Sequence, residues 1–212
     1  MNRKAITFPC GHLTLEGSYS YPEGRDDLPA VVLCHPHPLY GGSMDNNVIV
    51  ELASALSGAS IATLMFNFRG VGRSEGSYGG GIGERNDVIA AIDWLLSQPG
   101  VNGERIGLAG YSFGAMVGAP VSCQDARVKA VALISPPLDT EHIELLKKCT
   151  IPRLIVGGSE DEVALPEEVE MWSGELPEPR QFHLVQGADH FWHGYETAVA
   201  EIVTTFMLES LH

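Results

Sequence analysis

Short apolar runs alternate with amphipathic stretches from residue 30 onward, and this alternation constrains the fold more than any other feature. The runs are mostly apolar along their whole length, which is typical of parallel strands buried on both faces. They cover residues 30–34, 61–66, 106–109, 128–134, 153–156 and 181–185. The stretches with helical spacing cover residues 46–56, 84–96, 113–121, 166–172 and 195–208. This order predicts an α/β fold with a mostly parallel central sheet and helices on both of its faces.

The first 30 residues follow a different pattern. Apolar and polar residues alternate over residues 12–19, which indicates a half-exposed antiparallel strand or hairpin at an edge of the sheet. We find no repeat, no low-complexity segment and no long linker rich in Pro, Gly or Ser. We therefore expect residues 1–212 to form a single domain.

Composition and charge argue against several classes of partner. The chain has 13 basic and 27 acidic side chains and a formal net charge of −14, which would repel nucleic acid and anionic membrane surfaces. Its apolar runs are far shorter than the roughly 20 residues of a membrane-spanning helix. The four cysteines show no CxxC spacing, and the first residues lack the apolar core of a signal peptide. These features predict free thiols and a cytoplasmic location.

The best candidate for a catalytic group is Ser112, in the segment Gly-Tyr-Ser-Phe-Gly at residues 110–114. This segment lies between a predicted strand and a predicted helix, as a nucleophile elbow requires. Glycines beside the sharp turn would remove side chains that would otherwise clash there. The same turn would place the Phe113 amide at a helix N-terminus, where it could stabilise an oxyanion. An incidental serine in a Gly-rich connection is the competing interpretation.

A nucleophilic serine needs a general base and a carboxylate that orients this base, and in such a fold both follow the serine in the chain. His190 lies just beyond the last predicted strand, and Asp161 lies in the turn after the strand at residues 153–156. We therefore predict His190 as the base and Asp161 as the acid. His193 is the competing base, and Asp139, which follows the preceding strand, is the competing acid.

Together, these segments resemble a group of small bacterial α/β-hydrolases that is similar to dienelactone hydrolases and to serine peptidase-like esterases. The resemblance rests on residues 110–114, 157–163 and 187–190, on His-Pro-His-Pro-Leu-Tyr-Gly-Gly at residues 35–42 and on residues 67–76. Dienelactone hydrolases have cysteine at the elbow, whereas this chain has Ser112, which favours ordinary acyl transfer. The glycines near Arg69 do not form a phosphate-binding loop, and we expect Arg69 to tie together the loops around the elbow.

By position, residues 35–42 resemble the loop that supplies the second oxyanion amide in α/β-hydrolases. Pro36 stands where a glycine is usual, which leaves His37 as the matching donor, with Leu39 and Tyr40 as alternatives. A metal site at Cys34, His35 and His37 is disfavoured because no further ligand cluster accompanies them, and we expect no metal and no cofactor. We also expect no large lid, because residues 135–150 could supply only a short helix.

The resulting hypothesis is a serine hydrolase, in particular a carboxylesterase that acts on small esters or thioesters. A peptidase or amidase with the same residues and a non-catalytic binding protein are the alternatives. Aromatic residues near the strand ends could line a substrate pocket or serve only in packing, namely Tyr40, Tyr78, Phe191 and Trp192. The expected partner is a small acyl substrate, and a homodimer is possible.

Overall fold

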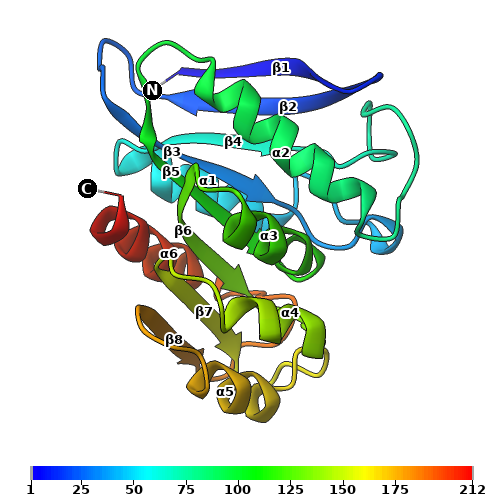
Figure 1. Cartoon of the computed structure of the whole chain (residues 1–212), viewed down its shortest axis with the longest axis vertical. Coiled ribbons are helices and arrows are strands. Elements are labelled where there is room, and N and C mark those ends of the chain that lie inside the picture. Colours follow the sequence, from blue (N-terminus) through cyan, green and yellow to red (C-terminus); the bar gives the residue numbers. More distant parts are fainter. Residues whose placement is uncertain (1, 212) are drawn as a thin grey trace.

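The computed structural model describes residues 2–211 and has one eight-stranded sheet with the strand order β1-β2-β4-β3-β5-β6-β7-β8 (Figure 1). The strands are β1 (Asn2–Cys10), β2 (Leu13–Tyr21), β3 (Leu28–Cys34), β4 (Ala62–Phe66), β5 (Val101–Tyr111), β6 (Val128–Ile134), β7 (Arg153–Gly158) and β8 (Arg180–Val185). All neighbouring strands from β4 to β8 are parallel, and only β1 with β2 and β2 with β4 are antiparallel. The predicted fold class is confirmed.

The N-terminal hairpin occupies the edge of the sheet as expected, but its burial differs from the prediction. Strand β2 is flanked by β1 and β4, and its residues 15–20 are all buried. The exposed edge strand is β1, in which polar side chains face solvent along the first half. The alternation at residues 12–19 therefore marks a strand one position in from the edge, because another strand covers its outer side.

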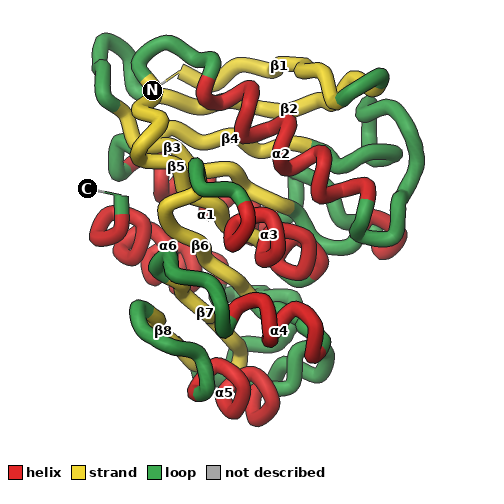
Figure 2. The backbone as a smooth tube through the Cα atoms, in the orientation of Figure 1, coloured by secondary structure: helices red, strands yellow, loops and turns green. Residues whose placement is uncertain are grey.

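Helices cover both faces of the sheet (Figure 2). They are the short 3-10 helix η1 (Pro38–Tyr40), α1 (Asn47–Gly58), α2 (Gly83–Leu96), α3 (Phe113–Gln124), α4 (Thr140–Leu146), α5 (Pro166–Gly174) and α6 (Glu196–Ser210). Buried residues of α2, α3 and α5 pack on one face of the sheet, and those of α1 and α6 pack on the other. The carboxyl ends of the parallel strands therefore lie between two helical layers, where ligand crevices form in open α/β sheets.

Residues 135–150 contain only the seven-residue helix α4, so no lid domain is inserted at this point. Within residues 2–211, every helix is too short or too polar to span a bilayer.

Two of the four cysteines are paired, which contradicts the expectation of free thiols. Cys123, near the end of α3, forms a disulfide with Cys149, which follows α4, whereas Cys10 and Cys34 are free and buried. The two bonded cysteines are 26 residues apart, and only the packing of α3 against α4 brings them together. This separation matches no short cysteine motif, and the sequence pattern therefore gave no signal for the bond.

Candidate active site

Ser112 lies at a sharp turn between strand β5 and helix α3. Its φ and ψ are 54° and −117°, a conformation that L-residues rarely adopt. The glycines on either side are required by close packing. A Cβ atom on Gly110 would overlap the backbone of Gly114, and one on Gly114 would overlap the Cys34 carbonyl. The elbow is thus built against the end of the neighbouring strand β3.

The structure brings the three residues predicted as nucleophile, base and acid together. The Oγ of Ser112 lies 3.0 Å from Nε2 of His190. The other ring nitrogen, Nδ1, lies 2.9 Å from both carboxylate oxygens of Asp161. All three residues are buried. Because an ionised carboxylate only accepts hydrogen bonds, Nδ1 carries the proton of the neutral imidazole, and the Nε2 lone pair faces the serine hydroxyl.

Asp161 is held in its ionised form by its surroundings. Burial alone would raise the pKa of Asp161. Hydrogen bonds from His190, from the Ser135 hydroxyl and from the amides of Ala164 and Val163 outweigh burial and hold the pKa below its ordinary value. The two amides donate over 2.8 and 2.9 Å. A carboxylate that is ionised near neutral pH can fix the orientation of the imidazole and stabilise its cation.

Ser135 and Trp192 belong to the same site, although the sequence analysis gave no role to Ser135 and only a possible pocket role to Trp192. The indole Nε1 of Trp192 donates to the Ser135 hydroxyl over 3.0 Å, and both residues are fully buried. The chain Trp192–Ser135–Asp161 therefore supports the carboxylate in addition to the bond from His190. Trp192 packs in the core beneath the site and does not line the cavity described below.

Backbone strain is concentrated around these residues. Among residues 2–211, five non-glycine residues have a positive φ, and three of them are Ser112, Ser135 and Trp192, with φ of 54°, 43° and 61°. Such conformations persist only where the surrounding structure holds them, and they gather at functional sites.

Two backbone amides at or near the elbow have no hydrogen-bond acceptor among the described residues. The Phe113 amide stands at the first position of α3, where a helix offers no acceptor to its own N–H groups. In the loop after β3, the Leu39 amide donates to the His37 ring and the Tyr40 amide donates to the His37 carbonyl. The His37 amide makes no hydrogen bond within the described part of the chain. Of the three alternatives in this loop, His37 is therefore the one whose amide is free.

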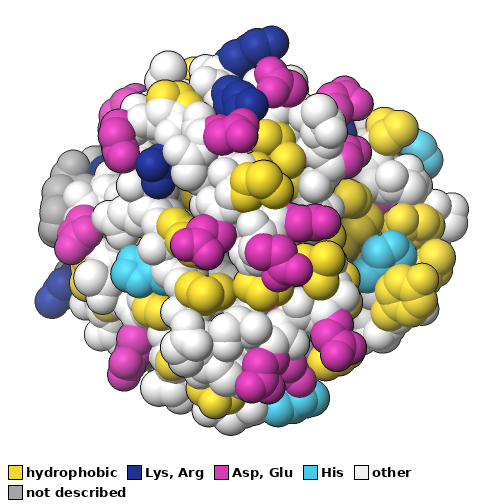
Figure 3. All heavy atoms as spheres, turned by 90° about the horizontal axis from the view of Figure 1, so that it is seen from below, with side chains coloured by type: hydrophobic (Ala, Val, Ile, Leu, Met, Phe, Trp, Pro, Cys, Tyr) yellow, Lys and Arg dark blue, Asp and Glu magenta, His cyan; other side chains and the backbone are white. Residues whose placement is uncertain are grey.

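A cavity of about 660 Å³ opens beside Ser112 and His190. Its lining residues are Pro36, His37, Tyr40, Gly41, Gly42, Asn46, Tyr78, Tyr111, Ser112, Phe113, Met116, Pro137, Val163, His190 and Phe191. Tyr40, Val163 and Phe191 are exposed at its mouth. In Figure 3, hydrophobic side chains are densest at the right of the view, and acidic side chains are scattered over the visible face. Tyr40, Tyr78 and Phe191, which the sequence offered as possible pocket residues, are among the lining residues.

The competing candidates lie elsewhere. Asp139 caps the N-terminus of α4 and bonds His142, and His193 is exposed and stacks on Phe191. His35 is fully buried: its Nδ1 contacts the Pro36 carbonyl, and its Nε2 accepts the Phe68 amide. Within residues 2–211, no group of three or more His, Cys, Asp or Glu side chains is placed to hold a metal ion.

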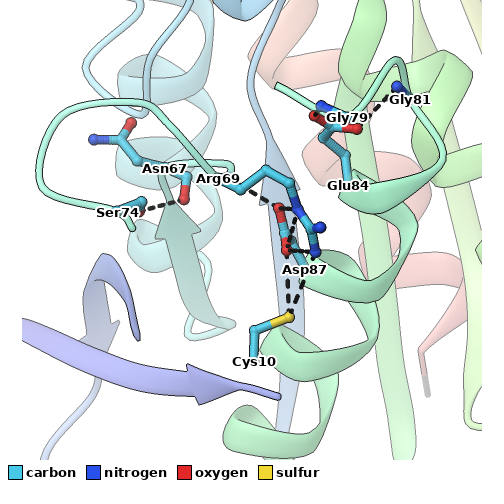
Figure 4. A network of polar contacts seen from close by, with 8 residues as sticks. All are labelled: Cys10, Asn67, Arg69, Ser74, Gly79, Gly81, Glu84 and Asp87. Carbon is cyan, nitrogen blue, oxygen red and sulfur yellow. Dashed lines mark hydrogen bonds and ion pairs between the residues drawn. The ribbon is translucent and has the colours of Figure 1, made fainter. Parts of the chain in front are cut away.

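The loop that contains Arg69 is fastened to helix α2 by buried carboxylates (Figure 4). The Arg69 guanidinium pairs with Asp87 at 2.6 Å, and the Arg69 amide donates to the same carboxylate. Further along, the amides of Gly79 and Gly81 donate to Glu84 over 2.7 and 2.8 Å. Asp87 and Glu84 are both fully buried. This network holds in place the segment between Arg69 and α2, which contributes Tyr78 to the lining of the cavity.

Comparisons with known proteins agree with this architecture. The family model of the X-Pro dipeptidyl-peptidases (S15 family) matches residues 18–145. An uncharacterised protein of Rickettsia prowazekii is 32% identical over 191 residues, which are 86% of this chain and 79% of that protein. An α/β serine hydrolase homologue from Coxiella burnetii superposes with a TM-score of 0.87 at 34% identity and covers 97% of both chains.

A serine hydrolase without a lid from Xanthomonas campestris superposes with a TM-score of 0.85 at 28% identity, over 100% of this chain and 96% of that one. This likeness agrees with the absence of an inserted lid domain after β6. The chain therefore belongs to the X-Pro dipeptidyl-peptidase (S15) family and has the fold of a lidless α/β-hydrolase.

Proposed function

We propose that the protein is a serine hydrolase that cleaves small, uncharged esters or thioesters through an acyl-enzyme at Ser112. The observation that carries this proposal is the contact of 3.0 Å between Ser112 Oγ and His190 Nε2, together with the contact of the other ring nitrogen with a buried carboxylate. A serine hydroxyl is a weak nucleophile on its own, and this arrangement is the one that activates it.

In the first half of the reaction, Ser112 Oγ attacks the carbonyl carbon of the ester while His190 Nε2 accepts the hydroxyl proton. The negative charge that develops on the carbonyl oxygen is stabilised by the free amides of Phe113 and His37. The C–O bond to the leaving alcohol then breaks, and His190 returns the proton to the alcohol oxygen. Asp161 remains ionised throughout and stabilises the imidazolium.

In the second half, water attacks the acyl-enzyme while His190 accepts one of its protons. The bond between the acyl carbon and Ser112 Oγ breaks, and the serine regains its hydrogen from His190. A carboxylic acid leaves, and the enzyme returns to its starting state.

The cavity favours an ester over a peptide substrate. None of the described residues that line it is Asp, Glu, Lys or Arg. A dipeptidyl-peptidase must place the charged amino terminus of its substrate near the site, and burying an ammonium ion without a counter-ion is costly. The match to the S15 family model keeps a peptidase or amidase as the second candidate.

Ester hydrolysis tests the proposal directly. We expect the purified protein to hydrolyse short para-nitrophenyl esters and to be labelled by a fluorophosphonate probe at Ser112. Ser112→Ala should lose both activities, whereas Ser122→Ala, which changes another buried serine in α3, should keep them. Full activity of Ser112→Ala, or a wild-type protein that neither turns over esters nor reacts with the probe, would show that the proposal is wrong. In the second case, a non-catalytic binding protein would explain the fold.

A second panel separates the two enzymatic candidates. We expect para-nitrophenyl esters to be cleaved with a much higher kcat/KM than X-Pro para-nitroanilides that carry a free amino terminus. Comparable or higher kcat/KM for the anilides would assign a peptidase with the same nucleophile.

A further inference from the structure

A cluster of aromatic rings forms the wall of the cavity next to the elbow, and His37 lies at its centre. The centroid of the His37 ring is 4.8 Å from that of Tyr40, 5.2 Å from that of Tyr78 and 4.8 Å from that of Phe113. Phe113 follows the nucleophile directly in the chain. A group bound against these rings would therefore lie beside the reacting carbonyl.

The hydrogen bonds of His37 determine which of its ring nitrogens carries the proton. Nδ1 accepts the Leu39 amide over 3.2 Å and caps the short helix η1, so this nitrogen has no hydrogen. Burial lowers the pKa of His37 and outweighs the opposing effect of Glu84, which favours the neutral ring. The single proton of the neutral imidazole must then be on Nε2.

This tautomer fixes the role of the neighbouring tyrosine. Nε2 of His37 lies 3.2 Å from the Tyr78 hydroxyl oxygen, and because Nε2 carries the proton, the hydroxyl oxygen is the acceptor of this bond. The hydroxyl hydrogen of Tyr78 is left to donate elsewhere. It meets no acceptor among residues 2–211, and Tyr78 lines the cavity.

The other two tyrosines of the lining do not share this property. The hydroxyl of Tyr111 already donates to the His190 carbonyl. Tyr40 is 88% exposed at the mouth, where water can satisfy its hydroxyl. Tyr78 is the half-buried tyrosine of the lining, and its donor is free.

The position of Tyr78 is fixed before any ligand arrives. The next residue, Gly79, donates its amide to the buried carboxylate of Glu84, and Gly81 donates to the other oxygen of that carboxylate (Figure 4). Little conformational freedom would be lost when the hydroxyl engages a ligand, and preorganisation of this kind favours binding.

We propose that Tyr78 is a specificity-determining residue that donates a hydrogen bond to an acceptor oxygen on the acyl part of the substrate. The inference rests on the proposed ester hydrolysis and narrows its substrate class. The preferred acyl group has an apolar or aromatic body that packs against the rings of His37 and Phe113. It also carries an uncharged acceptor such as an ether, carbonyl or hydroxyl oxygen.

Matched substrates can isolate this hydrogen bond. The probes are para-nitrophenyl esters of phenylpropanoic acids with a methoxy group at the ortho, meta or para ring position, each paired with the methyl compound of similar size. For each pair, the selectivity is the ratio of kcat/KM for the methoxy ester to that for the methyl ester. In Tyr78→Phe, we expect the largest of these ratios to fall about 2- to 10-fold, as the loss of one neutral hydrogen bond implies.

Tyr21→Phe is the matched control, because Tyr21 is also a tyrosine and lies outside the cavity, at the end of strand β2. This variant should keep all three ratios. Unchanged ratios in Tyr78→Phe, with a wild-type protein that hydrolyses the esters, would overturn the inference and leave the proposed function intact. Failure of the proposed function would instead appear as ester turnover that persists in Ser112→Ala.

Discussion

The backbone strain at Ser112 can be measured by comparing two variants that both lack the hydroxyl. Ser112→Ala and Ser112→Gly lose the same hydrogen bond to His190, but only the glycine removes the Cβ atom from a residue with φ 54° and ψ −117°. A strained conformation of this kind costs about 1–3 kcal/mol. Glycine also gives the unfolded chain more conformational entropy than alanine, which lowers the stability of Ser112→Gly by about 0.4–1 kcal/mol. We expect the free energy of unfolding to be about 1 kcal/mol higher for Ser112→Gly than for Ser112→Ala.

Urea unfolding at equilibrium, followed by tryptophan fluorescence, measures this difference. In a chain of this size, it corresponds to a melting temperature that is about 2–4 °C higher. Ala90→Gly serves as the control, because Ala90 lies in the middle of α2, where glycine is destabilising by about 1 kcal/mol. The reasoning is refuted if Ser112→Gly is no more stable than Ser112→Ala, because a Cβ atom at residue 112 would then cause no backbone strain.

Two further predictions concern Ser135 and Asp161, the residues that support His190. Ser135→Ala leaves the indole N–H of Trp192 without its acceptor in a fully buried position, so we expect urea unfolding to show a loss of about 1–3 kcal/mol, against less than 1 kcal/mol for Ser122→Ala. The pKa of Asp161 is lowered in the folded state, so its contribution to stability is present above the ordinary carboxyl value of 3.8 and is lost as the pH falls through the folded value. The stability difference between wild type and Asp161→Asn should accordingly shrink when urea unfolding is repeated from pH 7 down to about pH 3, and a difference that is constant with pH would contradict the lowered pKa.

Much of the fold could be predicted because each buried strand contains a short apolar run that is recognisable in the sequence. The runs at residues 30–34, 128–134 and 181–185 lie within β3, β6 and β8, with ends shifted by at most two residues. Strand β5 shows where this logic fails. It begins at Val101, five residues before the predicted run at residues 106–109. Residues 101–105 include Asn102, Glu104 and Arg105 and are half-exposed or exposed, so this part of the strand has no run of apolar residues that could predict it.

The residues of the candidate site also divide into those with a recognisable sequence pattern and those without one. Ser112, Asp161 and His190 could be predicted as one group because each follows a recognisable strand, and the carboxyl ends of parallel strands lie at one crevice. Ser135 also follows a strand, β6, but a lone serine before two prolines carries no chemical signature. Its role depends on Trp192, which is 57 residues away in the chain. Only the folded structure supplies that pairing, as it does for Cys123 and Cys149.

Ser135 and Trp192 share one property with Ser112 that links the missed part of the site to the predicted part: all three have a positive φ. Sequence propensity opposes such conformations in serine and tryptophan, so local preferences cannot have selected them. The two serines are held by long-range backbone hydrogen bonds instead. The Ser112 amide donates to the Ile134 carbonyl of β6, and the Ser135 amide donates to Val156 of β7. The positions of Ser112 and of Ser135, which supports Asp161, are therefore set by successive strands of one sheet, and the geometry of the candidate site follows from the spacing of those strands.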